Sequence, residues 1–344
     1  RNGSANGFKP KTLNTRMGKL FLSVPQTRSG KEPFYPSVIE KGLRSERALK
    51  SAMAEMYIQG VSTRKVAKVL QDLCGLEVSS TEVSRCNSLL DEEIKQWQNR
   101  PLGAIRFLLL DATYVKVRNG GVVQSCAVLI AAGITPEGTR TVLGSSVAQS
   151  EAGIHWKTFL SSLVSRGLTG VEMITSDRHA GLVEACCSVF SGAMWNRCHV
   201  HVQRDAAKYV PRTAWRAQVA EDIRQIYLVQ DVNKAQARLN EAVAYWGKKA
   251  PKLSEWMEEN IPEGFAVMKF PVCSRKRLHT SNLVERMNKE VKRRTNVVSV
   301  FPNVESAHRL VAALCMEVAQ DWECGRIYLN LQEDIPSSEN EFTE

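Results

Sequence analysis

The spacing of apolar residues becomes strand-like near the middle of the chain and predicts the start of an antiparallel sheet. Residues 105–117 are apolar on both alternating faces as far as Ala112, which is typical of a central strand covered on both sides. An Asn-Gly-Gly sequence at 119–121 is a hairpin signal between this strand and a second one predicted over 122–133. A third strand is predicted near 139–147.

The chain then alternates between helices and strands. A helix is predicted before a short strand over 171–175, which Asp177 closely follows. A second helix and a fifth strand, near 193–197, complete the pattern. Apolar residues at helical spacing define the two helices: Trp156, Phe159, Leu160 and Leu163 in the first, and Leu182, Ala185, Cys186 and Val189 in the second. Such an alternation of elements predicts an α/β fold.

Residues 206–272 show helical patterns alone, which predicts an all-α insertion in the α/β part. Its three tryptophans, Trp215, Trp246 and Trp256, are expected in the core of the insertion. Stacking of a tryptophan on an exposed DNA base is the alternative.

The amino-terminal part has a different pattern. Residues 1–43 are polar and turn-rich and predict an extended arm or small ribbon, with a strand-like run over 20–24. Residues 44–100 predict three short helices joined as in a helix-turn-helix unit. The third helix, predicted to reach Ile94, would enter the major groove and present Arg85. The phosphate contacts expected from this unit are Arg64, Lys65 and Lys68. A trihelical packing module without groove contacts is the alternative.

The composition favours a polyanionic partner. The chain of 344 residues has a net charge of +10 and a pI near 9.2, and residues 1–100 hold 17 Lys plus Arg against 10 Asp plus Glu. Such a surplus favours phosphate neutralisation with counterion release. Residues 275–294 hold eight more Lys or Arg against two acids, for which a solvated charged face is the alternative. The length and the 43% apolar content predict two or three domains.

The cysteines and the apolar runs bear on the compartment. Nine cysteines at irregular spacings do not form a secreted disulfide framework, so a reduced cytoplasm is expected. There is no run of about 20 apolar residues and no visible signal peptide, so no membrane span is predicted. The sequence starts at Arg1 rather than at a methionine, so an original amino-terminal segment is expected to precede it. Cys198, His199 and His201 resemble part of a zinc site, but no second Cys or His pair lies at ligand spacing nearby, which disfavours zinc.

Three acidic residues stand in settings that suit a metal site. Asp111 lies inside the first predicted strand, Asp177 closely follows a strand, and Glu285 lies on a helix for which Thr280 and Ser281 are suitable N-caps. A buried carboxylate is costly unless it is compensated, and residues leaving the carboxyl end of a strand are favoured site positions. Carboxylates are the ligands that Mg²⁺ and Mn²⁺ require, and two such ions about 3.5–4 Å apart can clamp the attacking and leaving oxygens of a phosphoryl transfer.

Each acid also has an ordinary structural interpretation. A buried, hydrogen-bonded aspartate would account for Asp111, and a helix N-cap would account for Asp177. A solvated helix face with a Glu285 to Lys289 ion pair would account for Glu285. The helix that carries Glu285 has an apolar stripe formed by Leu283, Met287 and Val291. The side chains predicted to project together on the opposite side are Glu285, Asn288, Lys289 and Lys292.

Several stretches of the sequence occur together in a set order. They are LLLDATYVKVR, VLG followed by SEAG and a Trp-containing helix, TSDRHAGL, WNRCHVHVQRD and HTSNLVERMNKEVKRRTNVVSVFPN. In these stretches the chain resembles the IS256 family of bacterial transposases, related to the eukaryotic Mutator-type elements, over most of its length. The resemblance implies an RNase H-like catalytic core, in which antiparallel strands precede strand–helix units, and an Asp, Asp, Glu triad that binds two divalent ions. The matching positions are Asp111, Asp177 and Glu285.

The same resemblance bears on further residues. The family carries a Cys-x-x-His element, matched by Cys198 and His201, which implies that these residues shape the active site or hold DNA. A buried thiol and a satisfied histidine are the alternative. Asn282 and Asn288 are expected to support the active site. The basic residues expected to follow a phosphate backbone there are Arg178, Arg286, Lys289, Lys292, Arg293 and Arg294.

The predicted fold is therefore an RNase H-like α/β core interrupted by an all-α insertion and preceded by a helix-turn-helix-like DNA-binding region. An insertion is expected because Asp111 and Asp177 are 66 residues apart whereas Asp177 and Glu285 are 108 apart. The predicted parts are an arm or ribbon over 1–43, a DNA-binding domain over 44–100, the core over 101–205 and 273–330, the insertion over 206–272, and an acidic, disordered tail over 331–344.

The predicted function is that of a DNA transposase that acts on the terminal inverted repeats of its own element and on target DNA. We expect a homodimer or higher multimer, Mg²⁺ or Mn²⁺ as cofactor with two ions per active site, and a cytoplasmic location at the nucleoid. Nicking of a 3′ end would precede strand transfer, and the resemblance further implies a circular intermediate. The alternatives are an RNase H-like structure-dependent nuclease and a domesticated, non-catalytic DNA-binding protein. The presence of all three acids disfavours the second alternative.

Overall fold

The computed structural model describes residues 4–28, 35–37, 39, 44–87, 90–325 and 327–330. The chain divides into two compact units. The first comprises Arg1–Lys95 with Arg293–Ser299, and the second comprises Gln96–Lys292 with Val300–Glu344. The tail predicted over 331–344 lies outside the described residues, as do parts of the predicted arm.

The first unit begins with a two-stranded antiparallel ribbon, formed by β1 (Ser4–Thr15) and β2 (Gly18–Arg28). The sequence pattern indicated a strand only over 20–24. The ribbon is longer because its pairing does not depend on a buried face: Phe8, Met17 and Phe21 are largely exposed. Alternation of apolar and polar residues, the usual strand signal, is therefore weak along it.

Three helices follow the ribbon, α1 (Arg47–Ile58), α2 (Thr63–Cys74) and α3 (Ser80–Asn87). They share an apolar core that includes Leu49, Met53, Val66, Leu70 and Val83. The third helix is shorter than predicted. A new helix, α4 (Asp91–Asn99), begins with three acidic residues in its first turn, which suit a helix amino terminus. The single helix predicted as far as Ile94 is therefore two helices.

The second unit is a mixed α/β structure around one five-stranded sheet, with strand order β5-β4-β3-β6-β7. The first three strands, β3 (Phe107–Asn119), β4 (Val122–Ile134) and β5 (Arg140–Ala148), pair antiparallel. The strand β6 (Met173–Ser176) lies parallel to β3, and β7 (Met194–Arg197) lies parallel to β6. The five strands predicted from the sequence are confirmed to within a few residues.

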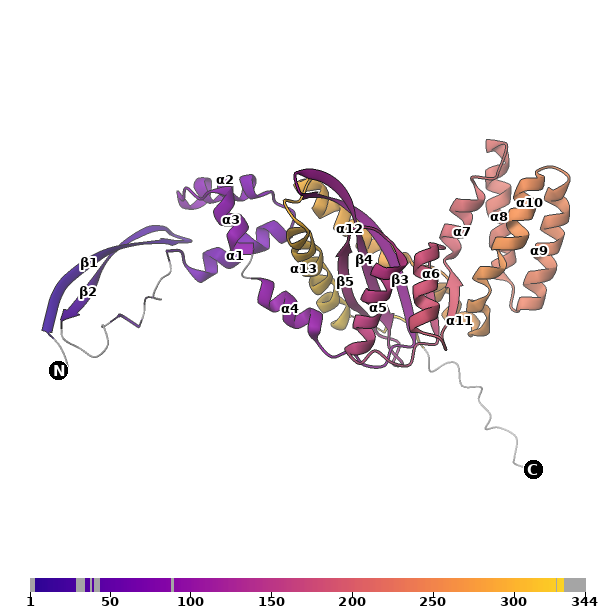
Figure 1. Cartoon of the computed structure of the whole chain (residues 1–344), viewed down its shortest axis with the longest axis horizontal. Helices are drawn as coiled ribbons and strands as arrows, with labels where there is room; N and C mark the ends of the chain where they lie inside the picture. Colours follow the sequence, from indigo (N-terminus) through magenta and orange to yellow (C-terminus); the bar gives the residue numbers. More distant parts are fainter. Residues whose placement is uncertain are drawn as a thin grey trace, which may run out of the picture. The chain divides into compact units, whose positions relative to one another are not determined.

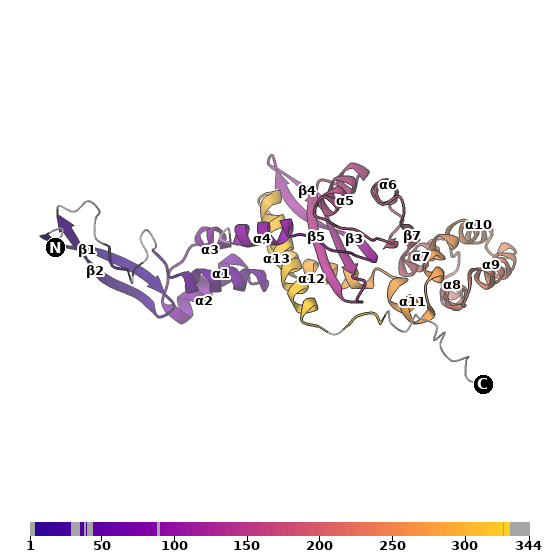
Figure 2. The ribbon, with the colours of Figure 1, turned by 90° about the horizontal axis from the view of Figure 1, so that it is seen from below.

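Helices cover both faces of the sheet (Figures 1 and 2). On one face, α5 (Gly153–Ser165) and α6 (Ala180–Val189) pack over Leu108 and Leu110 of β3. On the other face lie α12 (Asn282–Val298) and α13 (Val304–Glu323). Since side chains alternate along a strand, Asp111 points to the face opposite Leu110.

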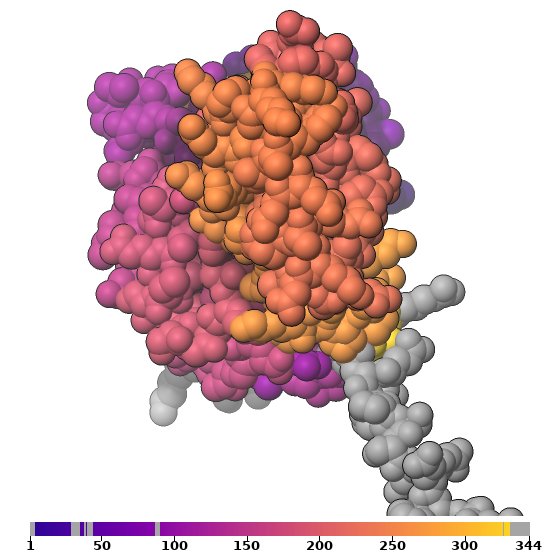
Figure 3. Space-filling view, turned by 90° about the vertical axis from the view of Figure 1, so that its right-hand side faces the viewer, coloured from indigo at the N-terminus to yellow at the C-terminus, as the bar shows by residue number. Residues whose placement is uncertain are grey.

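Between β7 and α12 the chain forms a group of helices at one side of the sheet, which Figure 3 shows as a continuous surface. They are α7 (His199–Ala206), α8 (Arg216–Leu228), α9 (Val232–Gly247), α10 (Pro251–Asn260) and α11 (Val272–Leu278). Trp246 and Trp256 are buried and Trp215 is half-buried, so the tryptophans serve the core as predicted. Helix α11 was not expected. No helix in the described part of the chain is long and apolar enough to cross a membrane.

Candidate functional site

The carboxyl ends of two short parallel strands and the middle of β3 meet at one edge of the sheet. Leu109 of β3 pairs with Thr175 of β6, and Ser176 of β6 pairs with Arg197 of β7. Continuing this register sets Asp111 level with Asp177, and Asp177 level with Cys198. The backbone N–H of Cys198 donates to the Ser176 carbonyl at 2.7 Å, which continues the pairing past the end of the strand. Neighbouring strands lie about 4.8 Å apart, so the sheet itself holds these three residues side by side.

Asp111 is a buried carboxylate, with 8% of its surface exposed. Asn288 of α12 donates from Nδ2 to Asp111 Oδ2 at 2.8 Å. Burial raises the pKa of Asp111 to about 6; the Asn288 bond and nearby His201 lower it, and Asp177 adds to the rise. The hydrogen-bonded aspartate that we considered is thus present, but it stands beside a second carboxylate.

Asp177 is half-buried and follows β6 directly. Its position argues against the N-cap interpretation, because His179 occupies the N-cap of α6. The raised pKa of Asp111, to which Asp177 contributes, indicates that the two carboxylates influence each other.

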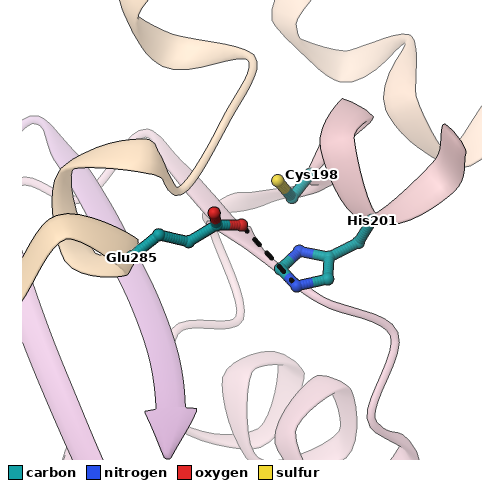
Figure 4. Close-up of side chains that lie close together, drawn as sticks. All are labelled: Cys198, His201 and Glu285. Atoms are coloured by element: carbon teal, nitrogen blue, oxygen red, sulfur yellow. Dashed lines mark ion pairs between the residues drawn. The ribbon is translucent and has the colours of Figure 1, made fainter. Parts of the chain in front are cut away.

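Glu285 lies in the first turn of α12, and its side chain is only 13% exposed. Its Oε1 is 3.8 Å from His201 Nε2, and Oε2 is 3.4 Å from a guanidinium nitrogen of Arg204. Figure 4 shows the carboxylate pointing from α12 toward the His201 ring. The ion-pair partners of Glu285 therefore come from α7. Glu285 does not form the solvated ion pair with Lys289 that was considered as an alternative.

Cys198 and His201 lie at the start of α7, and the structure brings both to Glu285 (Figure 4). The backbone N–H and the hydroxyl of Ser281 each donate to Cys198 Sγ at 3.3 Å. Burial opposes ionisation of the thiol, but the nearby His201 and the bonds from Ser281 lower the pKa of Cys198 overall. The pairing with Cys198 raises the pKa of His201 to about 9. The Ser281 hydroxyl thus bonds the sulfur, although the sequence suggested a helix cap.

Helix α12 places the two asparagines expected to support the active site differently. Asn282 is exposed, whereas Asn288 is buried against Asp111. Asn288 reaches the same site as Glu285, as predicted, but it is buried against the sheet rather than projecting opposite the apolar stripe. Asn288 Oδ1 is buried and has no hydrogen-bond partner among the described residues.

Most of the basic side chains expected to bind phosphates are exposed. Arg178 is partly engaged, because its Nε is 3.0 Å from Glu263 and it also donates to Asn260. Arg294 is buried and donates to the Ile58 carbonyl. Its side chain is therefore not placed to contact a phosphate, although the sequence had predicted such a contact. Besides Arg178, the exposed members are Arg64, Lys65, Lys68, Arg85, Arg286, Lys289, Lys292 and Arg293.

The sequence reasoning missed a buried arginine beside the site. Arg197, the last residue of β7, has a side chain 3% exposed. It donates to Asp205 at 2.7 Å, to Asn260 at 2.9 Å and to Glu263 at 3.0 Å, which ties the sheet edge to the insertion. The sequence feature that could have pointed to Arg197 is its position at the end of a short predicted strand. His199 is also set apart from the site, since its Nε2 lies 2.8 Å from the Gly264 carbonyl and its ring stacks on Tyr227.

The donor set can be compared with what a divalent ion needs. The carboxylates of Asp111, Asp177 and Glu285 and the unpartnered Asn288 Oδ1 are hard oxygen donors, which suit Mg²⁺ or Mn²⁺. The three carboxylates do not form one tight group in the described part of the chain. The group whose ligand atoms all lie within 4.8 Å of one another is Cys198, His201 and Glu285.

Comparison with known proteins gives the family. The family described as "Transposase, Mutator family" matches residues 1–325. The chain is 49% identical to the transposase for insertion sequence element IS406 of Burkholderia multivorans, over 96% of this chain and 85% of that protein. It is 43% identical to the ISRM5 transposase of Rhizobium meliloti, over 97% of this chain and 83% of that protein. It is 37% identical to the IS256 transposase of Tn4001 from Staphylococcus aureus, over 96% of this chain and 85% of that protein.

Among solved structures, a simian T-cell lymphotropic virus intasome in complex with a PP2A regulatory subunit is similar at 13% identity, over 66% of this chain and 72% of that chain. Its TM-score of 0.20 is too low to carry an argument about the fold. The sequence relatives are decisive by themselves: the resemblance noted from the motifs is confirmed, and the chain belongs to the Mutator family of transposases, which includes the IS256 transposase.

Proposed function

We propose that this protein is a DNA transposase that binds the terminal inverted repeats of its own insertion sequence, nicks DNA to free 3′ ends and joins those ends to target DNA. One observation carries the assignment of the active site. Asp111 of β3 lies level with Asp177, which directly follows the adjacent parallel strand β6, and α12 brings Glu285 and Asn288 to the same edge of the sheet.

The order of strands supports an RNase H-like core for this chemistry. Three antiparallel strands come first in the sequence, the fourth strand pairs beside the first, and the fifth strand pairs beside the fourth. This arrangement agrees with the core that the motifs implied. The helices between β7 and α12 correspond to the all-α insertion.

Asp111, Asp177 and Glu285, with Asn288 in support, would hold two Mg²⁺ or Mn²⁺ ions. Such ions, when bound, activate the attacking oxygen and stabilise the leaving 3′ oxygen of a phosphodiester. The protein's own residues prepare the site: Asn288 orients Asp111, and His201 with Arg204 hold the Glu285 carboxylate. Asp111 lies in β3 and Asp177 directly follows β6, so the sheet holds the two aspartates, and Glu285 would have to leave His201 and Arg204 to join them around the ions.

The remaining parts of the proposal concern DNA and assembly. Helices α1 to α3 form a helix-turn-helix-like unit in which Arg85 on α3 contacts base edges, and basic residues of α2 contact phosphates. Two copies or more act together at the ends of the element, and a circular form of the element is the intermediate. The protein acts at the bacterial nucleoid.

A joining assay tests the proposal. The chain is incubated with a fluorescent duplex that carries its element's terminal repeat, a plasmid target and Mg²⁺ or Mn²⁺, beside Glu285→Gln. Glu221→Gln, which changes an exposed acid on α8, is the matched control. We expect joined product from the unaltered chain and the control, none from Glu285→Gln, and DNA binding by all three. Nicking without joining would favour a nuclease, and binding without nicking would favour a non-catalytic DNA-binding protein.

A further inference from the structure

The side-chain group around Glu285 has a donor set that a pair of magnesium ions would not require. Cys198 offers a sulfur, His201 a ring nitrogen and Glu285 a carboxylate oxygen, and these atoms all lie within 4.8 Å of one another. The sequence disfavoured zinc because no second Cys or His pair lay near Cys198. The third donor is instead a glutamate 87 positions later, on another helix.

The local chain geometry holds the sulfur and the nitrogen together. Cys198 is the N-cap of α7 and His201 follows it by three positions, so both side chains lie on the same face of the first turn. A position at a helix amino terminus favours the thiolate. The two bonds that Ser281 donates to Cys198 Sγ also stabilise a negative sulfur. Such donors around a ligand atom are typical of metal sites.

We propose that Cys198, His201 and Glu285 bind Zn²⁺, with solvent as a fourth ligand, and that zinc inhibits the enzyme by withdrawing Glu285 from its catalytic position. The inhibitory part rests on the proposed function, whereas the binding part does not. Thiolate and imidazole select zinc over magnesium, and a thiolate with a carboxylate balances the charge of the ion.

The distances allow the site to form with small movements. With Zn–S near 2.3 Å and Zn–N and Zn–O near 2.0–2.2 Å, a tetrahedral ion places its ligands about 3.3–3.7 Å apart. His201 Nε2 and Glu285 Oε1 are already 3.8 Å apart. Arg204 has to release Glu285, which is a small obstacle because its side chain is 58% exposed and exposed ion pairs are weak.

Asp111 and Asp177 are not ligands of the proposed zinc site, so zinc and the catalytic ions compete only for Glu285. The structure thus predicts antagonism between two metals of different chemistry. Zinc should suppress joining at concentrations far below those of magnesium, and a chelator selective for zinc should restore it.

The first test uses Co²⁺ as a spectroscopic substitute for Zn²⁺ on the full-length, metal-free chain. We expect a cysteine-to-cobalt charge-transfer band in the near ultraviolet and visible bands of a tetrahedral ion, both removed by one equivalent of Zn²⁺. Cys198→Ser should abolish the charge-transfer band and His201→Asn should weaken Co²⁺ binding at least about tenfold. The matched controls are Cys273→Ser and Cys187→Ser, which alter exposed cysteines, and both should keep the spectrum.

The second test measures joining in Mg²⁺ with increasing Zn²⁺. Circular dichroism first shows which variants are folded; if Cys198→Ser is not, His201→Asn supplies the comparison. A missing charge-transfer band in the unaltered chain, or a band that survives in Cys198→Ser, would overturn the proposal. Binding without any joining by the unaltered chain would count against the proposed function alone. Joining that zinc does not inhibit, although the cobalt spectrum is as expected, would overturn the inhibitory part.

Discussion

At the scale of single residues, the surroundings of Asp111 suit the cation that the proposed function requires. Its carboxylate is buried, accepts a hydrogen bond from the side chain of Asn288 and lies level with another acid. Burial and repulsion both disfavour the charged form, which raises the pKa of Asp111 to about 6. A bound cation would remove this penalty, so the feature that destabilises the empty site favours the loaded one.

Replacing this charge should therefore stabilise the metal-free fold. We expect Asp111→Asn to raise the free energy of unfolding by about 1–3 kcal/mol at pH 8, since each unit of pKa shift corresponds to about 1.4 kcal/mol. The folded pKa lies above the unfolded one, so the penalty is present above pH 6 and absent below about 4. Urea unfolding in a chelator at pH 8 and pH 4 measures this, and DNA joining should be lost. A less stable variant at pH 8 would contradict the argument.

At the scale of elements, the crossing of α5 and α6 explains how Asp177 is held. These helices approach so closely that a Cβ on Gly181 would lie 2.6 Å from the backbone nitrogen of Gly153. Backbone atoms cannot move aside as a flexible side chain would. Because α6 begins three residues after Asp177, a shift of this helix would also displace the carboxylate.

Gly181→Ala should accordingly lower both stability and joining. Overpacking of this kind costs about 1–3 kcal/mol. Gly192→Ala is the control, because a Cβ there meets nothing within 4 Å. Thermal unfolding and the joining assay on the two variants give the comparison. Equal behaviour of the two would show that the crossing tolerates a methyl group and does not position Asp177.

The ion pairs of Arg197 lead to a second prediction at the scale of elements. Its buried guanidinium serves Asp205 and Glu263, and its removal takes away the buried partner of both acids and leaves them only the more exposed Lys208 and Arg178. Arg197→Met should cost roughly 3–5 kcal/mol of unfolding free energy. Arg224→Met removes an exposed arginine that pairs with Glu221 and should leave the urea midpoint nearly unchanged. A small effect of Arg197→Met would mean that the insertion docks mainly through apolar contacts.

The elements also show what the sequence could and could not predict. Four of the five strands were predictable because each has its own apolar pattern, and the all-α insertion because its period is helical throughout. The fifth strand, β7, was expected only from the order of elements, since its residues Met194–Arg197 include a polar and a charged side chain. The partners of α12 were not predictable: a helical stripe shows which side is apolar, but not that Asn288 faces Asp111. Contacts such as that between Ser281 and Cys198 join residues 83 positions apart, and no local pattern contains them.

At the scale of the whole molecule, the net charge of +10 should favour the proposed encounter with DNA. Each phosphate neutralised contributes about 0.9 to the slope of log affinity against log salt concentration. Changing Lys289 and Lys292 to Gln should reduce that slope by up to about 2 if both contact phosphates. Fluorescence anisotropy over a range of salt concentrations measures it. Changing Lys234 and Lys252 of the insertion removes the same charge, and an equal loss of slope there would assign the effect to overall charge.

The two aspartates and the glutamate of the proposed site come from widely separated parts of the second unit's sequence. Asp111 and Asp177 belong to the sheet, whereas Glu285 is supplied by α12, after the whole insertion. During synthesis, a chain that has left the ribosome only as far as residue 272 carries both aspartates but no Glu285. On the proposed assignment, a truncated chain that ends before α12 should therefore cut no DNA, although it keeps both aspartates.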